Sequence, residues 1–216
     1  MTPPLRILII HVCLMIFFTN PQKIIAEDDK ELWSSIGIKT KLPNSLELDL
    51  EQSLRFRDQM SSFKQTFTEL SVSYEIIDDL KLFIPIRYAL FRDKEKKRLS
   101  IGGSYKYDYK LANIRYRIKL QRTHEDNESP ADLFRQKISL EYKMNKTFRP
   151  FISGEVSYNY EMKKYQYDEN RFSFGFGLNL SKSRKIKIFY IRKLEKITKS
   201  NPDLINVFGV GYNFVW

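Results

Sequence analysis

The residues around His124 are the main candidates for catalysis in this chain. His124 is followed by Glu125 and Asp126, and Ser129 stands close by. A histidine beside an acid or a serine can activate a nucleophile or a water molecule. Closeness in the sequence does not bring side chains together, however, and a histidine in a polar connection is usually only solvated. We therefore expect no catalytic site, and we keep a membrane-embedded lipid hydrolase that uses His124 as an alternative.

Patterns for metal, thiol or phosphate chemistry are missing from the sequence. Cys13 is the only cysteine, and it lies inside an apolar run with Val12, rather than a small residue, before it. This context argues against lipid attachment. Once that run is removed, the chain has no cysteine for a disulfide, a thiolate metal site or cysteine catalysis. It also has no glycine-rich phosphate loop, and we expect neither a metal site nor a cofactor.

The N-terminus has the pattern of an export signal over residues 1–26. Arg6 precedes an apolar run from Ile7 to Phe18, and Ala26 offers a small residue for cleavage. The run is shorter than the roughly 20 residues that a membrane-spanning helix needs. We therefore predict that residues 1–26 are removed and that residues 27–216 form a barrel domain. The loss of this segment lowers the formal net charge from +11 to +9.

The last residues, 206–216, have the pattern of a strand that closes a barrel. Large apolar side chains occupy every second position, and small or polar residues lie mainly between them. Because side chains alternate across a strand, its two faces meet different surroundings. An aromatic strand at the end of a chain is typical of bacterial outer-membrane β-barrels. We expect this strand to serve in membrane assembly through Phe208, Val210, Tyr212, Phe214 and Trp216.

The same alternation recurs along the chain and predicts further strands. It is clearest over 46–56, where leucines alternate with polar residues, whereas a helix would scatter these leucines around its axis. The segments span roughly 9–13 residues, close to the length of a tilted transmembrane strand. Short turns alternate with longer charged loops, as in outer-membrane barrels; the loops are expected at 92–98, 123–132, 161–170 and 195–203.

The predicted fold class is all-β, a closed antiparallel transmembrane β-barrel. Eleven segments show the alternation, but bacterial single-chain barrels have even numbers of strands. We therefore expect about ten strands, with the first segment as an incomplete edge, and keep twelve as an alternative.

Tyrosines favour a barrel whose apolar face meets lipid. They recur near the ends of the segments, as expected of an aromatic girdle at a membrane surface; they are Tyr74, Tyr88, Tyr109, Tyr142, Tyr160 and Tyr190. A soluble periplasmic β-barrel would turn its apolar face inward around an apolar ligand, and it stays an alternative.

The polar face, which would line the interior, carries its charges in blocks. Acids predominate over 47–75 and bases over 115–137. A network of ion pairs that fills a narrow barrel is the simpler interpretation, because buried charges must be paired. The other is a polar conduit with acids on one wall and bases on another. The interior residues that we single out are Glu51, Arg55, Arg87, Arg117, Glu155 and Arg171.

Several short motifs resemble a known family by their order along the chain. They are Leu32-Trp33, Glu51-x-x-x-Arg55-Phe56, Arg87-Tyr88, Glu155 between Gly154 and Val156, and Asn170-Arg171 ahead of Phe174-Gly175-Phe176-Gly177. Nearly end to end, the mature chain resembles the domain of unknown function 2490 family of bacterial outer-membrane β-barrels. The resemblance implies export and a barrel, and it implies no activity.

Together these observations predict a non-enzymatic outer-membrane barrel of a Gram-negative bacterium. We expect a charged, largely side-chain-filled interior and a structural or narrow-channel transport role. The expected partners are outer-membrane lipid, lipopolysaccharide, whose phosphates the basic stretch 92–98 would attract, and the barrel-assembly machinery. Nucleic acid is not expected, because no binding motif is present. The sequence leaves the oligomeric state open.

Overall fold

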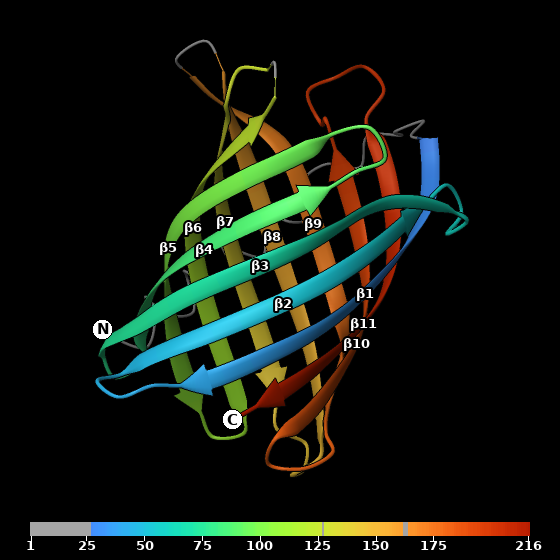
Figure 1. Cartoon of the computed structure of the whole chain (residues 1–216). Helices are drawn as coiled ribbons and strands as arrows, with labels where there is room; N and C mark the ends of the chain where they lie inside the picture. Colours follow the sequence, from blue (N-terminus) through green and yellow to red (C-terminus); the bar gives the residue numbers. More distant parts are fainter. Residues whose placement is uncertain (1–26, 127, 162–163) are drawn as a thin grey trace, which may run out of the picture.

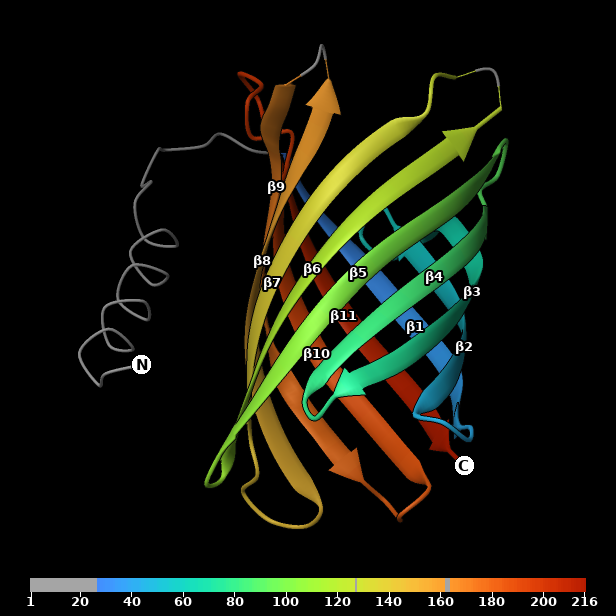
Figure 2. The same cartoon turned by 90° about the vertical axis from the view of Figure 1, so that its left-hand side faces the viewer.

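Eleven strands form one closed barrel (Figures 1 and 2). The computed structural model describes residues 27–126, 128–161 and 164–216, so the predicted export signal, 1–26, lies outside the described residues. Within these ranges no helix is long and apolar enough to cross a membrane. The strands are β1 (Glu27–Lys41), β2 (Leu46–Arg57), β3 (Ser62–Ile77), β4 (Leu80–Leu90), β5 (Glu95–Tyr109), β6 (Ala112–Glu125), β7 (Ala131–Tyr142), β8 (Phe148–Glu161), β9 (Lys164–Asn179), β10 (Arg184–Glu195) and β11 (Asp203–Val215).

The barrel closes through a parallel pair of strands. β1 lies beside β11 in parallel, with Trp33 in register with Gly209, and beside β2 in antiparallel. An up-and-down chain with an odd number of strands brings its first and last strands together in the same direction, so a parallel pair is needed to close it. The prediction of about ten strands is therefore wrong by one. The first segment is a full strand of 15 residues, paired on both sides.

The apolar side chains point outward and the polar ones inward. Leu50, Leu70 and Ile101 are 43–55% exposed on the outer surface. Glu47 and Ser73, which alternate with such residues, are buried in the interior. A soluble barrel with an apolar interior would show the opposite distribution. The predicted outward direction of the apolar face is therefore confirmed.

The connections at the two ends of the barrel differ less in length than the sequence predicts. The end that holds the C-terminus, here called the turn end, has the connections 42–45, 78–79, 110–111, 143–147 and 180–183. The opposite end, here called the loop end, has 58–61, 91–94, 126–130, 162–163 and 196–202. The long charged loops expected over 92–98 and 161–170 are wrong in extent, because β5 begins at Glu95 and β9 at Lys164.

Aromatic pairs extend the β8–β9 hairpin into the stretch expected to be a loop. The ring centroids of Tyr158 and Tyr167 are 5.7 Å apart, and those of Tyr160 and Tyr165 are 4.9 Å apart. Cross-strand aromatic pairs of this kind add about 0.5–1.5 kcal/mol beyond their buried area. They therefore favour strand over loop even though the stretch is rich in polar residues.

Candidate functional site

Packed side chains fill the interior toward the loop end. Trp33, Phe67 and Val207 point inward there and are at most 8% exposed. Glu31 is also buried; its carboxylate accepts a hydrogen bond from Trp33 Nε1 at 2.7 Å and pairs with Lys64. The pairing neutralises a carboxylate that would be costly to bury alone. We call this set, with the arginines and glutamates described next, the interior plug.

Two arginines stack on the aromatic rings of the plug. The guanidinium carbon of Arg55 lies 3.6 Å from the ring centre of Trp33 and 4.9 Å from that of Phe67. That of Arg87 lies 3.7 Å from the Phe67 ring, and its Nε donates to Glu69 Oε2 at 2.7 Å. Planar guanidinium groups suit such stacking, which is worth up to about 2 kcal/mol when water is excluded. The stack thus joins four neighbouring strands, β1 to β4, across the interior.

Glycines on β9 and β11, near the parallel β1–β11 pair, leave room for another aromatic ring of the plug. Phe189 packs against the buried cluster of Trp33, Ile191, Ile205 and Val207. A Cβ atom at Gly209 would collide with the Phe189 ring, and one at Gly175 would collide with the Ile188 carbonyl oxygen and the Phe189 Cα atom. The absent side chains therefore let β9, β10 and β11 carry this ring inside the barrel.

Glu155 lies at the centre of a network of arginines and glutamates. Arg135 forms a close ion pair with its carboxylate, Arg117 Nη2 donates to it at 3.3 Å, and Arg171 Nη1 lies 3.8 Å from it. Arg171 also pairs closely with Glu169, which lies 3.7 Å from Arg135. The two carboxylates are buried, with Glu155 only 5% exposed, whereas the Arg117 side chain reaches the cavity. Such reciprocal pairing is what allows charges to be buried at all.

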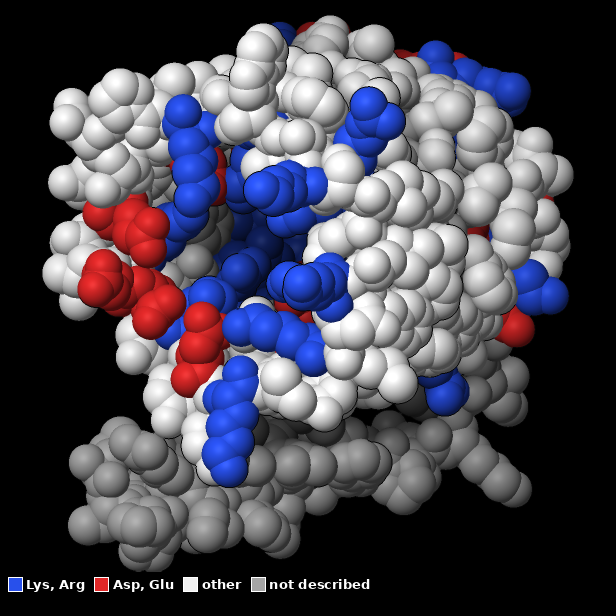
Figure 3. All heavy atoms as spheres, turned by 90° about the horizontal axis from the view of Figure 1, so that it is seen from below, with Lys and Arg blue, Asp and Glu red and all other residues white. Residues whose placement is uncertain are grey.

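A cavity of about 890 Å³ occupies the interior toward the turn end. Figure 3 looks into the barrel from this end and shows a hollow lined by lysine and arginine, with carboxylates at one side. The lining reaches inward to Glu69, Lys119 and Lys137, which border the plug. The expectation of a largely filled interior therefore holds for the plug but not for the turn-end half.

Most carboxylates of the cavity lining lie on one wall, and most of its cations lie on the other. β2 and β3 contribute Glu47, Asp49, Glu51 and Glu69, and Lys39 and Lys81 of the neighbouring strands pair with Glu47. On the other side β7 contributes one carboxylate, Glu141, and the cations that come mainly from β6, β7, β8 and β10 are Arg115, Arg117, Lys119, Lys137, Arg149, Lys185 and Lys187. In the order of strands around the barrel, β7 and β8 lie across from β2. The turn-end half therefore matches the second interpretation of the sequence, a polar conduit with a transverse field, while the plug matches the first, a network of ion pairs.

The structure places all six of the interior residues singled out from the sequence inside the barrel. Arg55 and Arg87 belong to the aromatic stack, and Arg117, Glu155 and Arg171 to the network around Glu155. Glu51 lines the acidic wall of the cavity with Glu69. Sequence reasoning missed Phe67 as a plug residue. The signal was present, because Phe67 is a large aromatic residue at a position of the polar face of β3.

The outward residues of the closing strand lie where the sequence places them. Phe208 and Val210 are exposed on the outer surface, and the rings of Phe214 and Trp216 are 6.5 Å apart at the turn end. The role of these residues in membrane assembly stays a prediction.

The residues around His124 do not converge. His124 lies within β6, in register with Lys97, and its side chain is exposed. Glu125 is buried on the opposite face, where it pairs with Lys94 and Lys96. Because successive side chains of a strand point to opposite faces, His124 and Glu125 cannot act on one substrate atom. Within the described ranges no group of three or more His, Cys, Asp or Glu residues could hold a metal ion.

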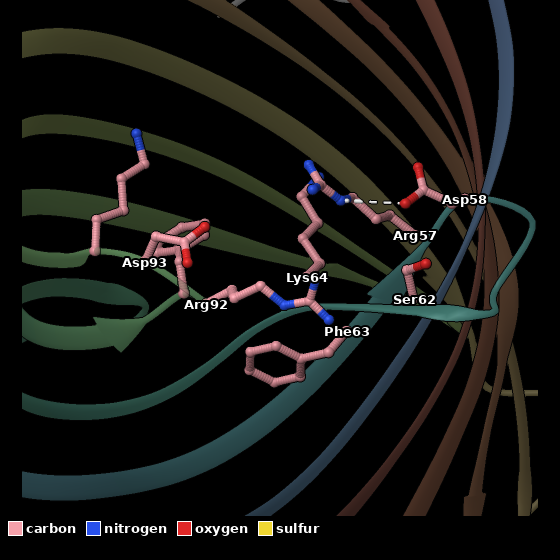
Figure 4. A pocket seen from close by; sticks show the side chains of 9 residues that line it. Arg57, Asp58, Ser62, Phe63, Lys64, Arg92 and Asp93 are labelled. Carbon is pink, nitrogen blue, oxygen red and sulfur yellow. Dashed lines mark ion pairs between the residues drawn. The ribbon is translucent and has the colours of Figure 1, made fainter.

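A smaller hollow of about 270 Å³ lies at the loop end between 58–61 and 91–94. Figure 4 shows its lining, with Arg57, whose Nε lies 3.5 Å from Asp58, and Arg92 from the next connection. The Glu125 carboxylate accepts a hydrogen bond from Lys94 and raises the pKa of the Lys94 ammonium above its usual value. The basic loop predicted over 92–98 is shorter than expected, since Arg98 lies in β5 and donates to Thr123 at 3.1 Å.

The sequence matches the profile of a protein family over residues 30–202, and the family is described as "Protein of unknown function (DUF2490)". The chain belongs to this family. A search of curated proteins found no match. The barrel is similar to a bacterial polysaccharide outer membrane secretin (TM-score 0.51, 7% identity, 78% of this chain and 74% of that one). It is also similar to the NanC porin (TM-score 0.51, 10% identity, 77% of this chain and 87% of that one). At these sequence identities the similarity is evidence for a shared fold alone.

Proposed function

We propose that this member of the DUF2490 family is a non-enzymatic β-barrel of the bacterial outer membrane. It would be exported with cleavage of residues 1–26 and would have a narrow-channel or structural role. The observation that carries the proposal is the inverted distribution of side chains, with apolar residues on the outer surface and ionic residues inside. This distribution suits a wall that meets lipid and an interior that meets water. The family assignment and the fold of the similar proteins support it.

The plug defines the kind of channel that we propose. Aromatic rings, guanidinium groups and the network around Glu155 occupy the interior between the cavity and the loop end. Wild-type protein in a planar bilayer should therefore give small conductance steps or none. The turn end, with the C-terminus and the shorter connections, would face the periplasm, as in other outer-membrane barrels.

The alternatives of the sequence analysis find less support. A soluble barrel around an apolar ligand needs apolar side chains inside, whereas the cavity is lined mainly by charged and hydroxyl groups. A hydrolase based on His124 needs a partner acid or serine, and Glu125 faces the other way.

We also propose that the loop-end hollow contacts lipopolysaccharide phosphates through Arg57 and Arg92, and that β11 is the strand presented to the barrel-assembly machinery.

Gel migration of protein from isolated outer membranes tests this proposal. Folded barrels resist mild detergent because every backbone group is paired within the closed sheet, so unboiled protein should migrate as a compact species. Boiling should shift it to the position of the unfolded chain. Recovery in the soluble periplasm, without such a shift, would contradict the proposal.

A further inference from the structure

We propose that the turn-end cavity is a binding site for a ligand that carries at least two anionic groups and several hydroxyl groups. The ligand would enter through the turn end and lie between the two charged walls. This inference rests on the proposed outer-membrane barrel, because the site exists only in the folded, lumen-bearing state.

The basic wall carries three lysines that have no carboxylate within 4 Å in the described part of the chain. Lys119, Lys137 and Lys187 line the cavity, and none forms an ion pair within 4 Å among the described residues. Lys137 stands in register with Glu155, but the Glu155 carboxylate is already held by three arginines. The Lys187 ammonium lies 4.1 Å from the ring centre of Phe151. None of the three amino groups is therefore occupied by a carboxylate of the described residues, and each is available to an anionic group of a ligand.

The register of the strands places like charges next to one another on this wall. Across the β6–β7 pair Lys119 is directly opposite Arg135, and Arg117 is directly opposite Lys137. Both arginines pair with Glu155, and Arg135 is not part of the cavity lining, so the two lysines are the cations that lack a partner here. Like charges at such positions destabilise a sheet. A ligand with two anionic groups would relieve the repulsion at these lysines, because each group would accept charge-assisted hydrogen bonds from Lys119 or Lys137.

The acidic wall determines what else the ligand must carry. Glu51 is directly opposite Glu69 across the β2–β3 pair, and Glu69 is occupied by Arg87. Within the described residues Glu51 has no cation within 4 Å, and Ser71, in register with Asp49, lines the same wall. A purely anionic ligand would be repelled here, whereas hydroxyl groups would donate to the carboxylate. A cavity of about 890 Å³ lies within the range of small-molecule sites, so one ligand with both kinds of group can reach both walls.

Two probes separate the contributions of the walls. Fructose 1,6-bisphosphate carries two anionic groups and hydroxyl groups, and tripolyphosphate carries anionic groups alone. Each is titrated calorimetrically at low salt into full-length protein in uncharged detergent. The variant Lys119→Gln/Lys137→Gln/Lys187→Gln should weaken fructose 1,6-bisphosphate binding by at least about tenfold. The control Lys97→Gln/Lys196→Gln/Lys199→Gln removes the same charge from exposed positions outside the cavity lining and should leave it unchanged.

The variant Glu51→Gln tests the acidic wall. It should weaken fructose 1,6-bisphosphate binding, because an amide accepts weaker hydrogen bonds than a carboxylate, and strengthen tripolyphosphate binding, because it removes a repulsion. Strengthened binding of both probes would overturn the hydroxyl part of the inference. No binding, or equal binding to the cavity and control triple variants, would overturn all of it. These binding results are compared only between samples whose gel migration shifts on boiling, because that shift identifies the folded barrel. Protein whose migration does not shift contradicts the outer-membrane proposal instead.

Discussion

Replacing Phe67 and Trp33 with alanine should convert the closed barrel into a conducting one. Both rings are buried in the plug, and the guanidinium groups of Arg55 and Arg87 stack on them. Without the rings the two arginines lose their platform and repel each other, so water can extend from the cavity toward the loop end. In planar bilayers we expect conductance several times that of the wild type. Each large-to-small change should also cost about 3–5 kcal/mol of folding free energy.

The control for this prediction is Leu70→Ala, which truncates an outward side chain three positions along β3 from Phe67. It should leave the conductance unchanged. The single variant Phe67→Ala serves if the double variant does not fold, and boiled and unboiled gels identify the folded samples. Folded Phe67→Ala protein with wild-type conductance would show that Phe67 does not close the interior.

Glu155→Gln should be the most destabilising of the single charge removals in the interior. The carboxylate is 5% exposed and contacts three arginines, Arg117, Arg135 and Arg171. Neutralising it leaves Arg135 and Arg171 to share Glu169 and leaves Arg117 without a carboxylate among the described residues. Breaking a buried ion pair in this way costs about 3–5 kcal/mol. Urea unfolding of the barrel in lipid vesicles measures the loss in free energy of unfolding.

Glu141→Gln is the matched control for Glu155→Gln. Glu141 also pairs with an arginine, Arg149 at 3.4 Å, but its side chain is 39% exposed to the cavity. Exposed pairs contribute about 0–1 kcal/mol, so this variant should unfold almost as the wild type does. Equal losses in the two variants would mean that the network around Glu155 is as solvated as the cavity wall.

The alternation of apolar and polar residues was enough to predict a barrel and the outward face of its strands. It was not enough to predict the number of strands or the extent of the loops. The leucines of β2 and the aromatic residues of β11 indicated which face points outward, because a strand has only two faces. The predicted strand number was wrong because the rule that barrels have even numbers of strands was preferred to the eleven segments visible in the sequence. The parallel pairing of β1 with β11 allows a barrel with an odd number of strands to close. Loops were overestimated where tyrosines pair across β8 and β9.

The candidate site was predictable in composition but not in arrangement. The sequence indicates that Arg55, Arg87 and Glu155 face the interior, yet it does not indicate which strands bring their side chains to the same level. That depends on the stagger between neighbouring strands, which is fixed only when the barrel closes. The stagger joins Trp33 of β1 to Ile191 of β10 in one cluster and leaves the cations of β6 and β7 facing an open cavity.

Thiol labelling of two adjacent positions on β3 tests the central claim most directly. With Cys13→Ser as the background, Leu70→Cys and Ser71→Cys are exposed separately to a water-soluble maleimide in permeabilised outer membranes. Leu70 points outward, and Ser71 lines the cavity. We expect the cysteine at 71 to react and the cysteine at 70 to react only after denaturation, because lipid covers it. Rapid labelling at 70 in the native membrane, with protection at 71, would contradict the barrel as described.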